Sequence, residues 1–383
     1  MTDSNFSAGQ DVAIVGFAQT KHVRAAETLS EIEMIQPVIA EVMEQVGLKH
    51  NEFDFFCSGS SDYLAGQPFS FVMTLDAIGA SPPVAESHVE MDGAWALYEA
   101  YLKIRSGHAD TALVYGYGKS SPGDLPRVLS RMCEPYYTAP LWPTSVEIAG
   151  LQARACIDGG VTSEAEMAEV AARSRRSAQD NPNAQLAWDR SAEDVLAGDY
   201  LANPLRRDDC APITDGGAAI VLASPAKAAE LCARPAWISG LDHRIDAHSL
   251  SVRDLTRAPS AKLAAEGAGV GDGPVDVAEL HTCFTHHEAI LRNELGLADD
   301  VNINPSGGPL ASNPMMAAGM IRLGEVANRI FDGSVNRGVA HATGGHLMQH
   351  NLVAVLDAAQ PGAAAQSSTA ARSSTSNEAG GNA

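Results

Sequence analysis

Apolar residues along the first part of the chain alternate between strand-like runs and helical spacing. Residues 11–16 form a short β-rich run that ends in glycine. Between positions 29 and 46, apolar side chains recur at the spacing of an amphipathic helix. Residues 53–57 and 111–117 predict two further strands, and residues 93–105 predict a helix between them. Alternating strands and helices are typical of a layered α/β fold.

The second part of the chain repeats this order of elements. It contains two predicted strands, at about 236–240 and 275–280, and two predicted helices, from about 285 onwards and at about 314–330. Two final apolar runs follow, at 338–342 and 351–356. The two final runs mirror those at 111–117 and 218–223. We therefore expect two diverged copies of one unit.

These patterns set the expected domain organisation. Residues 11–235 form an N-terminal half that ends with the apolar strand of 213–224. This half includes an irregular insertion at about 119–205, which contains a helix near 164–179. Residues 236–358 form the C-terminal half. Residues 1–10 and 359–383 are polar or small and cannot bury enough apolar surface to become ordered, so we expect both ends to be disordered.

The composition narrows the classes of partner. A net charge of −21 on 383 residues disfavours nucleic acid. No apolar run reaches the roughly 18 residues of a membrane span, and the N-terminus lacks the pattern of a signal peptide, so we expect a cytoplasmic protein. The six cysteines show no CxxC pairing and are expected to be reduced.

An anionic cofactor such as coenzyme A remains possible despite the acidic composition, because a few arginines and helix N-termini suffice to hold phosphates. The best local cluster includes Arg173 and Arg176. A solvated helix face would show the same pattern, and the two interpretations stay open.

Five motifs, in order, resemble the sterol carrier protein branch of the thiolases. They are DVAIVGFAQT at 11–20, PNAQ at 182–185, CAPITDGGAAIVLAS at 210–224, ELHTCFTHHE at 279–288 and INPSGGPLASNP at 303–314. The resemblance implies a thiolase-like fold of two βαβαβ halves in five α-β-α-β-α layers. It also implies acyl-CoA substrates and a homodimer, and it suggests no metal.

The chain differs from this family at three catalytic positions. The segment EMDGAWAL at 90–97 aligns with the helix that the nucleophilic cysteine begins, which puts Glu90 in the place of that cysteine. Asn313 falls where the family has the activating histidine of Gly-His-Pro, and Ala342 falls at the proton-shuttling cysteine. The histidine of the family's His-Asp-Cys-Phe motif survives as His281.

Each candidate site residue has a functional and a structural interpretation. His281 lies where the family binds a thioester oxygen, so it could stabilise an oxyanion, or it could be a histidine at the edge of the core. Glu90 and Asp92 could act as acid or base, or could only cap a helix. His346 could replace the lost cysteine. The glycine-rich bend of 306–308, with Ser306, Gly307 and Gly308, could approach a substrate or form a tight turn.

Three histidines, at 341, 346 and 350, lie close together in the sequence. We expect no metal there, because the family context offers none and the spacing gives only weak support for convergence.

We expect an enzyme that cleaves or forms a C–C bond in a coenzyme A thioester without a covalent intermediate, by a retro-aldol step. The resemblance associates such cysteine-less relatives with steroid side-chain degradation and with a small OB-fold partner. Two alternatives stay open: a non-catalytic lipid or acyl-CoA binder or scaffold subunit, and a true thiolase that uses another cysteine such as Cys57.

Overall fold

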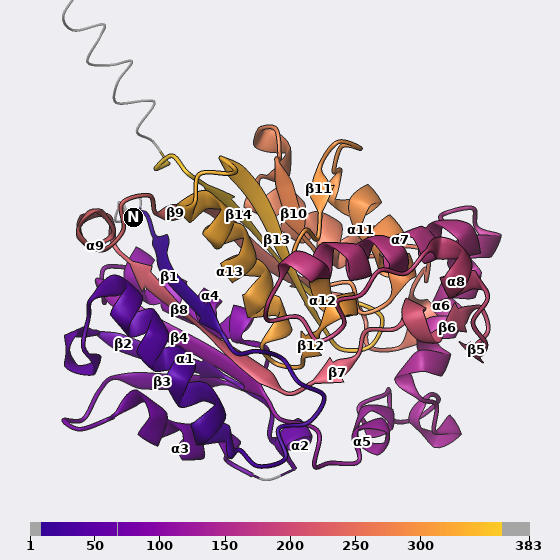
Figure 1. Cartoon of the computed structure of the whole chain (residues 1–383), viewed down its shortest axis with the longest axis horizontal. Helices are drawn as coiled ribbons and strands as arrows, with labels where there is room; N and C mark the ends of the chain where they lie inside the picture. The colour runs from indigo at the N-terminus through magenta and orange to yellow at the C-terminus, as the bar shows by residue number, and fades with distance from the viewer. Residues whose placement is uncertain (1–8, 67, 362–383) are drawn as a thin grey trace, which may run out of the picture.

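The computed structural model describes residues 9–66 and 68–361, which surround a ten-stranded mixed sheet (Figure 1). From the centre outwards, the first half has the order β1, β8, β4, β2, β3, and the second half has the order β9, β14, β13, β10, β11. The strands are β1 (Ala13–Gln19), β2 (Phe55–Gly59), β3 (Glu86–Val89), β4 (Thr111–Gly118), β8 (Gly216–Ala223), β9 (Ala236–Ile245), β10 (Val277–Glu279), β11 (Asn302–Ile303), β13 (Arg337–Gly344) and β14 (His350–Asp357). The halves therefore repeat one topology, as the sequence predicts, and they join where β1 and β9 pair antiparallel.

Helices complete the five layers. Helices α4 (Gly93–Arg105) and α13 (Ala318–Phe331) contact each other and share one hydrophobic core with the inner faces of both half-sheets. Helix α1 (Glu31–Val46) covers the outer face of the first half, where Ile35, Ile39 and Val42 are buried at helical spacing. Helices α10 (Pro259–Ala268) and α11 (Thr285–Leu295) cover the outer face of the second half. The predicted α-β-α-β-α arrangement is confirmed.

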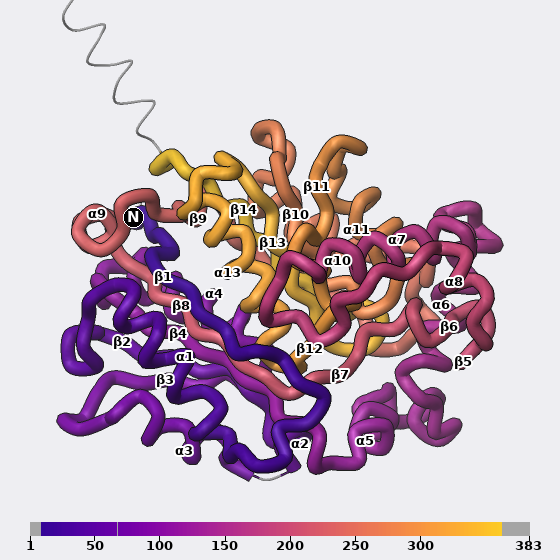
Figure 2. Tube along the Cα trace, in the orientation of Figure 1, coloured from indigo at the N-terminus to yellow at the C-terminus, as the bar shows by residue number. Residues whose placement is uncertain are grey.

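The insertion lies between β4 and β8. It contains α5 (Leu125–Arg131), α6 (Ser145–Asp158), α7 (Glu164–Ser177), α8 (Ala192–Leu196) and the pair β5 (Tyr200–Ala202) and β6 (Leu205–Arg206). Figure 2 shows this magenta segment leaving the first half and crossing to the second. There α7 packs on α11 and on the short helix α12 (Gly308–Ala311). An insertion in one half thus covers a face of the other.

Two local predictions differ from the structure. The helix expected from position 314 begins at Ala318, because Asn313–Pro314 form the short strand β12, which pairs with β7 (Ile213–Thr214). Helix α10 was not expected, since its buried residues are mainly alanines and give a weak periodic signal.

The predicted disordered ends lie mostly outside the described residues, since positions 1–8 and 362–383 are not described. Inside the described part, the Gln10 side chain donates to the carbonyl of Ile104 at 2.6 Å. The Gln360 side chain donates to Asp11 at 2.9 Å. Both described ends are therefore tied to the fold at these positions.

Within residues 9–66 and 68–361, no helix is both long enough and apolar enough to cross a membrane. The expected cytoplasmic location stays a prediction.

Candidate active site

A cavity of about 440 Å³ opens where the two halves and the insertion meet. Its wall includes the start of α4, strand β12, the segment after β10 and the loop between β13 and β14. Five methionines contribute to this wall: Met91, Met132, Met315, Met316 and Met348. Such a volume suits a small-molecule ligand, and flexible thioether side chains adapt to irregular apolar groups. The predicted site residues that line the cavity are Glu90, Asp92, His281, Asn313 and His346.

His281 presents a hydrogen-bond donor to this cavity. The backbone N–H of Thr343 donates to Nδ1 of His281 at 3.2 Å, which assigns the imidazole hydrogen to Nε2. The ring of His341 is fixed in the same way, because its Nδ1 accepts from the His281 backbone N–H and its Nε2 donates to Asn351. The His281 side chain is therefore held as one tautomer by backbone and side-chain contacts.

Burial keeps the His281 imidazole neutral. Desolvation, together with the nearby His341 and the positive charge of Arg322, lowers its pKa to about 3. The Asn313 side chain slightly opposes this shift, although its Oδ1 forms no well-directed hydrogen bond within the described part of the chain. A neutral imidazole with a fixed N–H is suited to donate a hydrogen bond to a developing oxyanion.

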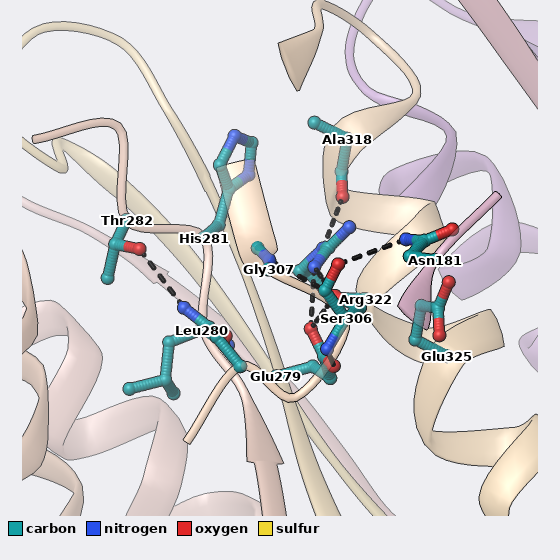
Figure 3. Close-up of polar contacts among 12 residues, drawn as sticks. Asn181, Glu279, Leu280, His281, Thr282, Ser306, Gly307, Ala318, Arg322 and Glu325 are labelled. Carbon is teal, nitrogen blue, oxygen red and sulfur yellow. Dashed lines mark hydrogen bonds and ion pairs between the residues drawn. The ribbon is translucent and has the colours of Figure 1, made fainter. Parts of the chain in front are cut away.

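A buried ionic network holds the segment from which His281 projects (Figure 3). The Glu279 carboxylate accepts from the Ser306 backbone N–H at 3.0 Å and from the Ser306 hydroxyl at 2.7 Å. Arg322 of α13 donates to Glu279 at 2.5 Å and to the Ser306 hydroxyl at 2.8 Å. Figure 3 shows the His281 ring pointing away from the Glu279 carboxylate. The network therefore fixes the backbone while leaving the imidazole to the cavity.

The bend of 306–308 belongs to this network and does not line the cavity. Gly307 has a φ of 89° and Gly308 a φ of 60°, so the turn needs residues that tolerate left-handed backbone. A side chain on Gly307 would also meet Ala178 at 2.7 Å. In this structure Ser306, Gly307 and Gly308 position the His281 segment.

Asp92 joins the two central helices. It caps α4 by accepting from the Ala94 backbone N–H at 2.9 Å, and it accepts from the backbone N–H groups of Gly319 and Met320 in α13, each at 2.9 Å. A Cβ on Gly319 would lie 2.7 Å from the carboxylate, so this contact requires glycine. Burial raises the pKa of Asp92, against the backbone hydrogen bonds and Arg322. All of these contacts fit the capping interpretation.

Glu90 sits at the rim of the cavity, two residues before Asp92, the N-cap of α4. Its side chain is 49% exposed and lies 3.6 Å from the Nε2 of His88. One carboxylate oxygen accepts from the Asp62 backbone N–H at 2.7 Å. Glu90, which the sequence resemblance predicts to lie at the place of the nucleophilic cysteine, thus carries an accessible carboxylate beside a histidine.

His346 already has a partner on the insertion. Its Nε2 lies 2.9 Å from the carbonyl of Leu129 in α5, and burial lowers its pKa. The side chain therefore ties the β13–β14 loop to the insertion.

The three histidines of this region do not converge. The His341 ring bonds to Asn351, the His346 ring faces Leu129 and the His350 ring lies edge-on to Trp95. Among the described residues, no group of three His, Cys, Asp or Glu side chains is placed to hold a metal ion.

All six cysteines are free, and two of them line the cavity. Burial raises the pKa of both Cys210 and Cys283 to about 12, which keeps them as thiols at neutral pH. Cys57 is fully buried in β2, inside the central hydrophobic core, and burial raises its pKa too. These surroundings do not favour a thiolate nucleophile.

The arginines proposed for phosphate binding lie on α7, away from the cavity wall. Arg173 forms an ion pair with Glu288 of α11. The Arg176 side chain is 61% exposed and lies 3.9 Å from Asp189. The structure does not bring these two residues to the cavity.

The cavity wall also contains His287, to which the sequence assigned no role of its own. His287 is 2% exposed, lines the cavity and has no hydrogen-bond partner at Nδ1 or Nε2 among the described residues. The motif ELHTCFTHHE contains it, but sequence spacing alone does not distinguish it from its neighbour His286.

Comparisons with known proteins agree with this architecture, although no family model matches the chain. An acetyl-CoA acetyltransferase of Methanothermobacter thermautotrophicus is 26% identical over 90% of this chain and 96% of its own length. Human sterol carrier protein 2 is 24% identical over 89% of this chain and 69% of its own length. The solved structure of the Ltp2-ChsH2(DUF35) aldolase matches with a TM-score of 0.75 and 18% identity, over 91% of this chain and 98% of that chain. Solved thiolases share the fold too, so the predicted thiolase-like fold is confirmed.

Proposed function

We propose that this chain, which is similar to an acetyl-CoA acetyltransferase and to sterol carrier protein 2, acts on coenzyme A thioesters and cleaves a C–C bond in them without a cysteine nucleophile. The substrate would be a β-hydroxyacyl thioester with a bulky apolar acyl group such as a steroid side chain. The methionine-rich wall and the cavity volume of about 440 Å³ support an acyl group of this kind.

The reaction would be a retro-aldol cleavage. A base takes the proton of the β-hydroxyl group, the C–O bond becomes a carbonyl, and the Cα–Cβ bond breaks. The electron pair of that bond passes into the thioester as an enolate, which then takes a proton at Cα. The products are a shortened acyl thioester and an aldehyde or ketone, and no oxidant, metal or free coenzyme A is consumed.

The cavity residues supply the groups that this reaction needs. The His281 Nε2–H would donate to the enolate oxygen, where charge develops. Glu90 would be the base, since its carboxylate lies at the rim and has access to solvent for proton exchange.

One observation carries the proposal: the cavity combines the fixed His281 donor with the accessible carboxylate of Glu90, which the sequence resemblance aligns with the thiolase cysteine. The two cysteines that do line it have a pKa of about 12 and remain thiols. An enolate-forming step without covalent attachment fits this set of groups, whereas thiolysis does not.

Substitution of His281 and Glu90 tests the proposal. His281→Phe should lower kcat on a β-hydroxyacyl-CoA by about 10²–10³, the usual loss of one oxyanion donor, while ligand binding is retained. Glu90→Gln should lower kcat by about 10²–10⁴ as a lost general base. Glu86→Gln is the matched control, because Glu86 lies four residues earlier on β3 and does not line the cavity.

Two results would contradict the proposal. If both active-site variants cleave the substrate at the wild-type rate, the two side chains have no part in the chemistry. If the wild-type chain binds acyl-CoA without any turnover, the chain is the non-catalytic binder or scaffold that remains the alternative.

We also propose a small OB-fold partner and a homodimer. Support for a partner comes from the solved aldolase, whose name pairs two components. The insertion adds four large exposed apolar side chains between two cavity-lining segments, namely Tyr136, Tyr137, Leu141 and Trp142. Light scattering of the purified chain, alone and with a co-purified small subunit, would measure both assemblies.

A further inference from the structure

The first turn of α11 faces the cavity and carries four consecutive polar side chains, from Thr285 to Glu288. Three of them have partners. The Thr285 hydroxyl donates to Asp209 at 2.7 Å, the His286 Nε2 lies 3.1 Å from the Oε1 of the Gln152 side chain, and Glu288 pairs with Arg173. These contacts fix the orientation of the turn from three sides.

His287 is the exception in this turn. It is 2% exposed and lines the cavity, and both of its ring nitrogens lack a hydrogen-bond partner within the described chain. Its neighbours are rings, with Phe284 at 5.3 Å and His286 at 4.6 Å between centroids. A buried polar group without a hydrogen-bond partner costs free energy of folding. Its presence in a cavity wall therefore indicates that a ligand supplies the missing partner.

We propose that His287 binds the β-hydroxyl group of the substrate, an assignment that rests on the proposed function. A neutral imidazole offers one N–H donor and one nitrogen acceptor. A hydroxyl group both donates and accepts, so it can pair with whichever ring nitrogen faces it. A keto oxygen can only accept, and a methylene group can do neither.

The proposal makes His287 the residue that distinguishes hydroxy from unsubstituted acyl groups. His281 and His287 then have separate tasks on one ligand, at the thioester oxygen and at the β-oxygen. Burial lowers the pKa of His287, and the nearby His286 and His281 lower it further, so His281 and His287 both remain neutral.

A ligand pair tests this assignment without turnover. The probes are two coenzyme A thioethers of equal chain length, one with a hydroxyl at the β-position and one without. Both lack the thioester carbonyl, so neither can form an enolate or be cleaved. Calorimetry on the wild-type chain should show about tenfold tighter binding of the hydroxy probe, the usual size of one buried hydrogen bond.

Three variants complete the experiment. His287→Phe should bind the two probes equally, since it keeps a ring but has no nitrogen. His287→Gln should restore part of the preference, because an amide both donates and accepts. His286→Gln is the matched control and should keep the full preference, since His286 is on the same turn but does not line the cavity.

The outcomes separate this assignment from the proposed function. A wild-type chain that cleaves β-hydroxyacyl thioesters but binds both probes equally overturns the assignment and leaves the reaction standing. An unchanged preference in His287→Phe overturns it as well. A wild-type chain that binds neither probe and has no turnover overturns the proposed function together with the assignment.

Discussion

Cys210 and Cys283 place two thiols in the cavity wall. The effect of removing them distinguishes a cysteine mechanism from the one proposed. Since burial raises the pKa of both to about 12, neither forms an appreciable amount of thiolate at neutral pH. The double substitution Cys210→Ala with Cys283→Ala should therefore keep kcat within about threefold of wild type, a margin that allows for small repacking losses. Steady-state kinetics on a β-hydroxyacyl-CoA would measure this, and a loss of about a thousandfold would restore a covalent role for one thiol.

The Asp92 carboxylate caps two central helices, α4 and α13, through three backbone N–H groups. Asp92→Ala should lower the free energy of unfolding by about 2–4 kcal/mol, as three buried donors lose their acceptor. Asp124→Ala is the matched control: Asp124 caps α5 at the surface through one longer contact of 3.4 Å, and its loss should cost about 0.5–1 kcal/mol.

Urea denaturation of both variants would measure these differences. Equal losses in Asp92→Ala and Asp124→Ala would contradict the structural role given to Asp92. A fully stable but inactive Asp92→Ala variant would move this residue from capping to chemistry.

The elements that the sequence predicts well are those whose signal is local. Helix α4 has the predicted bounds, and its start follows from Asp92 and Gly93. The start of α13 was predicted four residues early, since Asn313–Pro314 pair with β7, whose residues lie one hundred positions earlier in the chain. No spacing rule reveals such a contact.

The candidate site was predicted in the same uneven way. Glu90, His281 and Asn313 could be placed because motifs align them with working positions, and the structure brings them to one cavity. Ser306 was recognised as part of a bend, but its role depends on Arg322, which comes from a distant helix. His287 received no functional role from the sequence, because its lack of a hydrogen-bond partner is visible only once the neighbouring side chains are in place.

At the scale of the whole molecule, buried histidines should make stability depend on pH. Burial lowers the pKa of His22, His281 and His286 to about 3 and that of His341 to about 4. The unfolded chain takes up these protons near pH 6.5, whereas the folded chain cannot. The stability that these neutral histidines contribute is therefore fully present above pH 6.5. It is lost as the pH falls from 6.5 towards their folded-state pKa values of about 4 and 3.

Unfolding measured at pH 8, 6 and 5 should show falling stability. Each histidine contributes at most about 1.4 kcal/mol per pH unit, and the raised pKa values of Asp92, Asp209 and Glu288 act in the opposite sense. His286→Gln should reduce the slope of the free energy of unfolding against pH by up to about 1.4 kcal/mol per pH unit, the value for one proton. An unchanged pH dependence of the free energy of unfolding in His286→Gln would contradict the burial of a neutral imidazole at that position.

The reaction itself is tested most directly by product analysis. The purified chain, alone and with any co-purifying small subunit, would receive matched β-hydroxyacyl and β-ketoacyl thioesters of coenzyme A with one bulky acyl group, and mass spectrometry would identify the products. We predict that the hydroxy compound yields a shortened thioester and an aldehyde or ketone without added free coenzyme A. Cleavage of the keto compound that depends on free coenzyme A would instead demonstrate thiolysis and contradict a mechanism without a cysteine nucleophile.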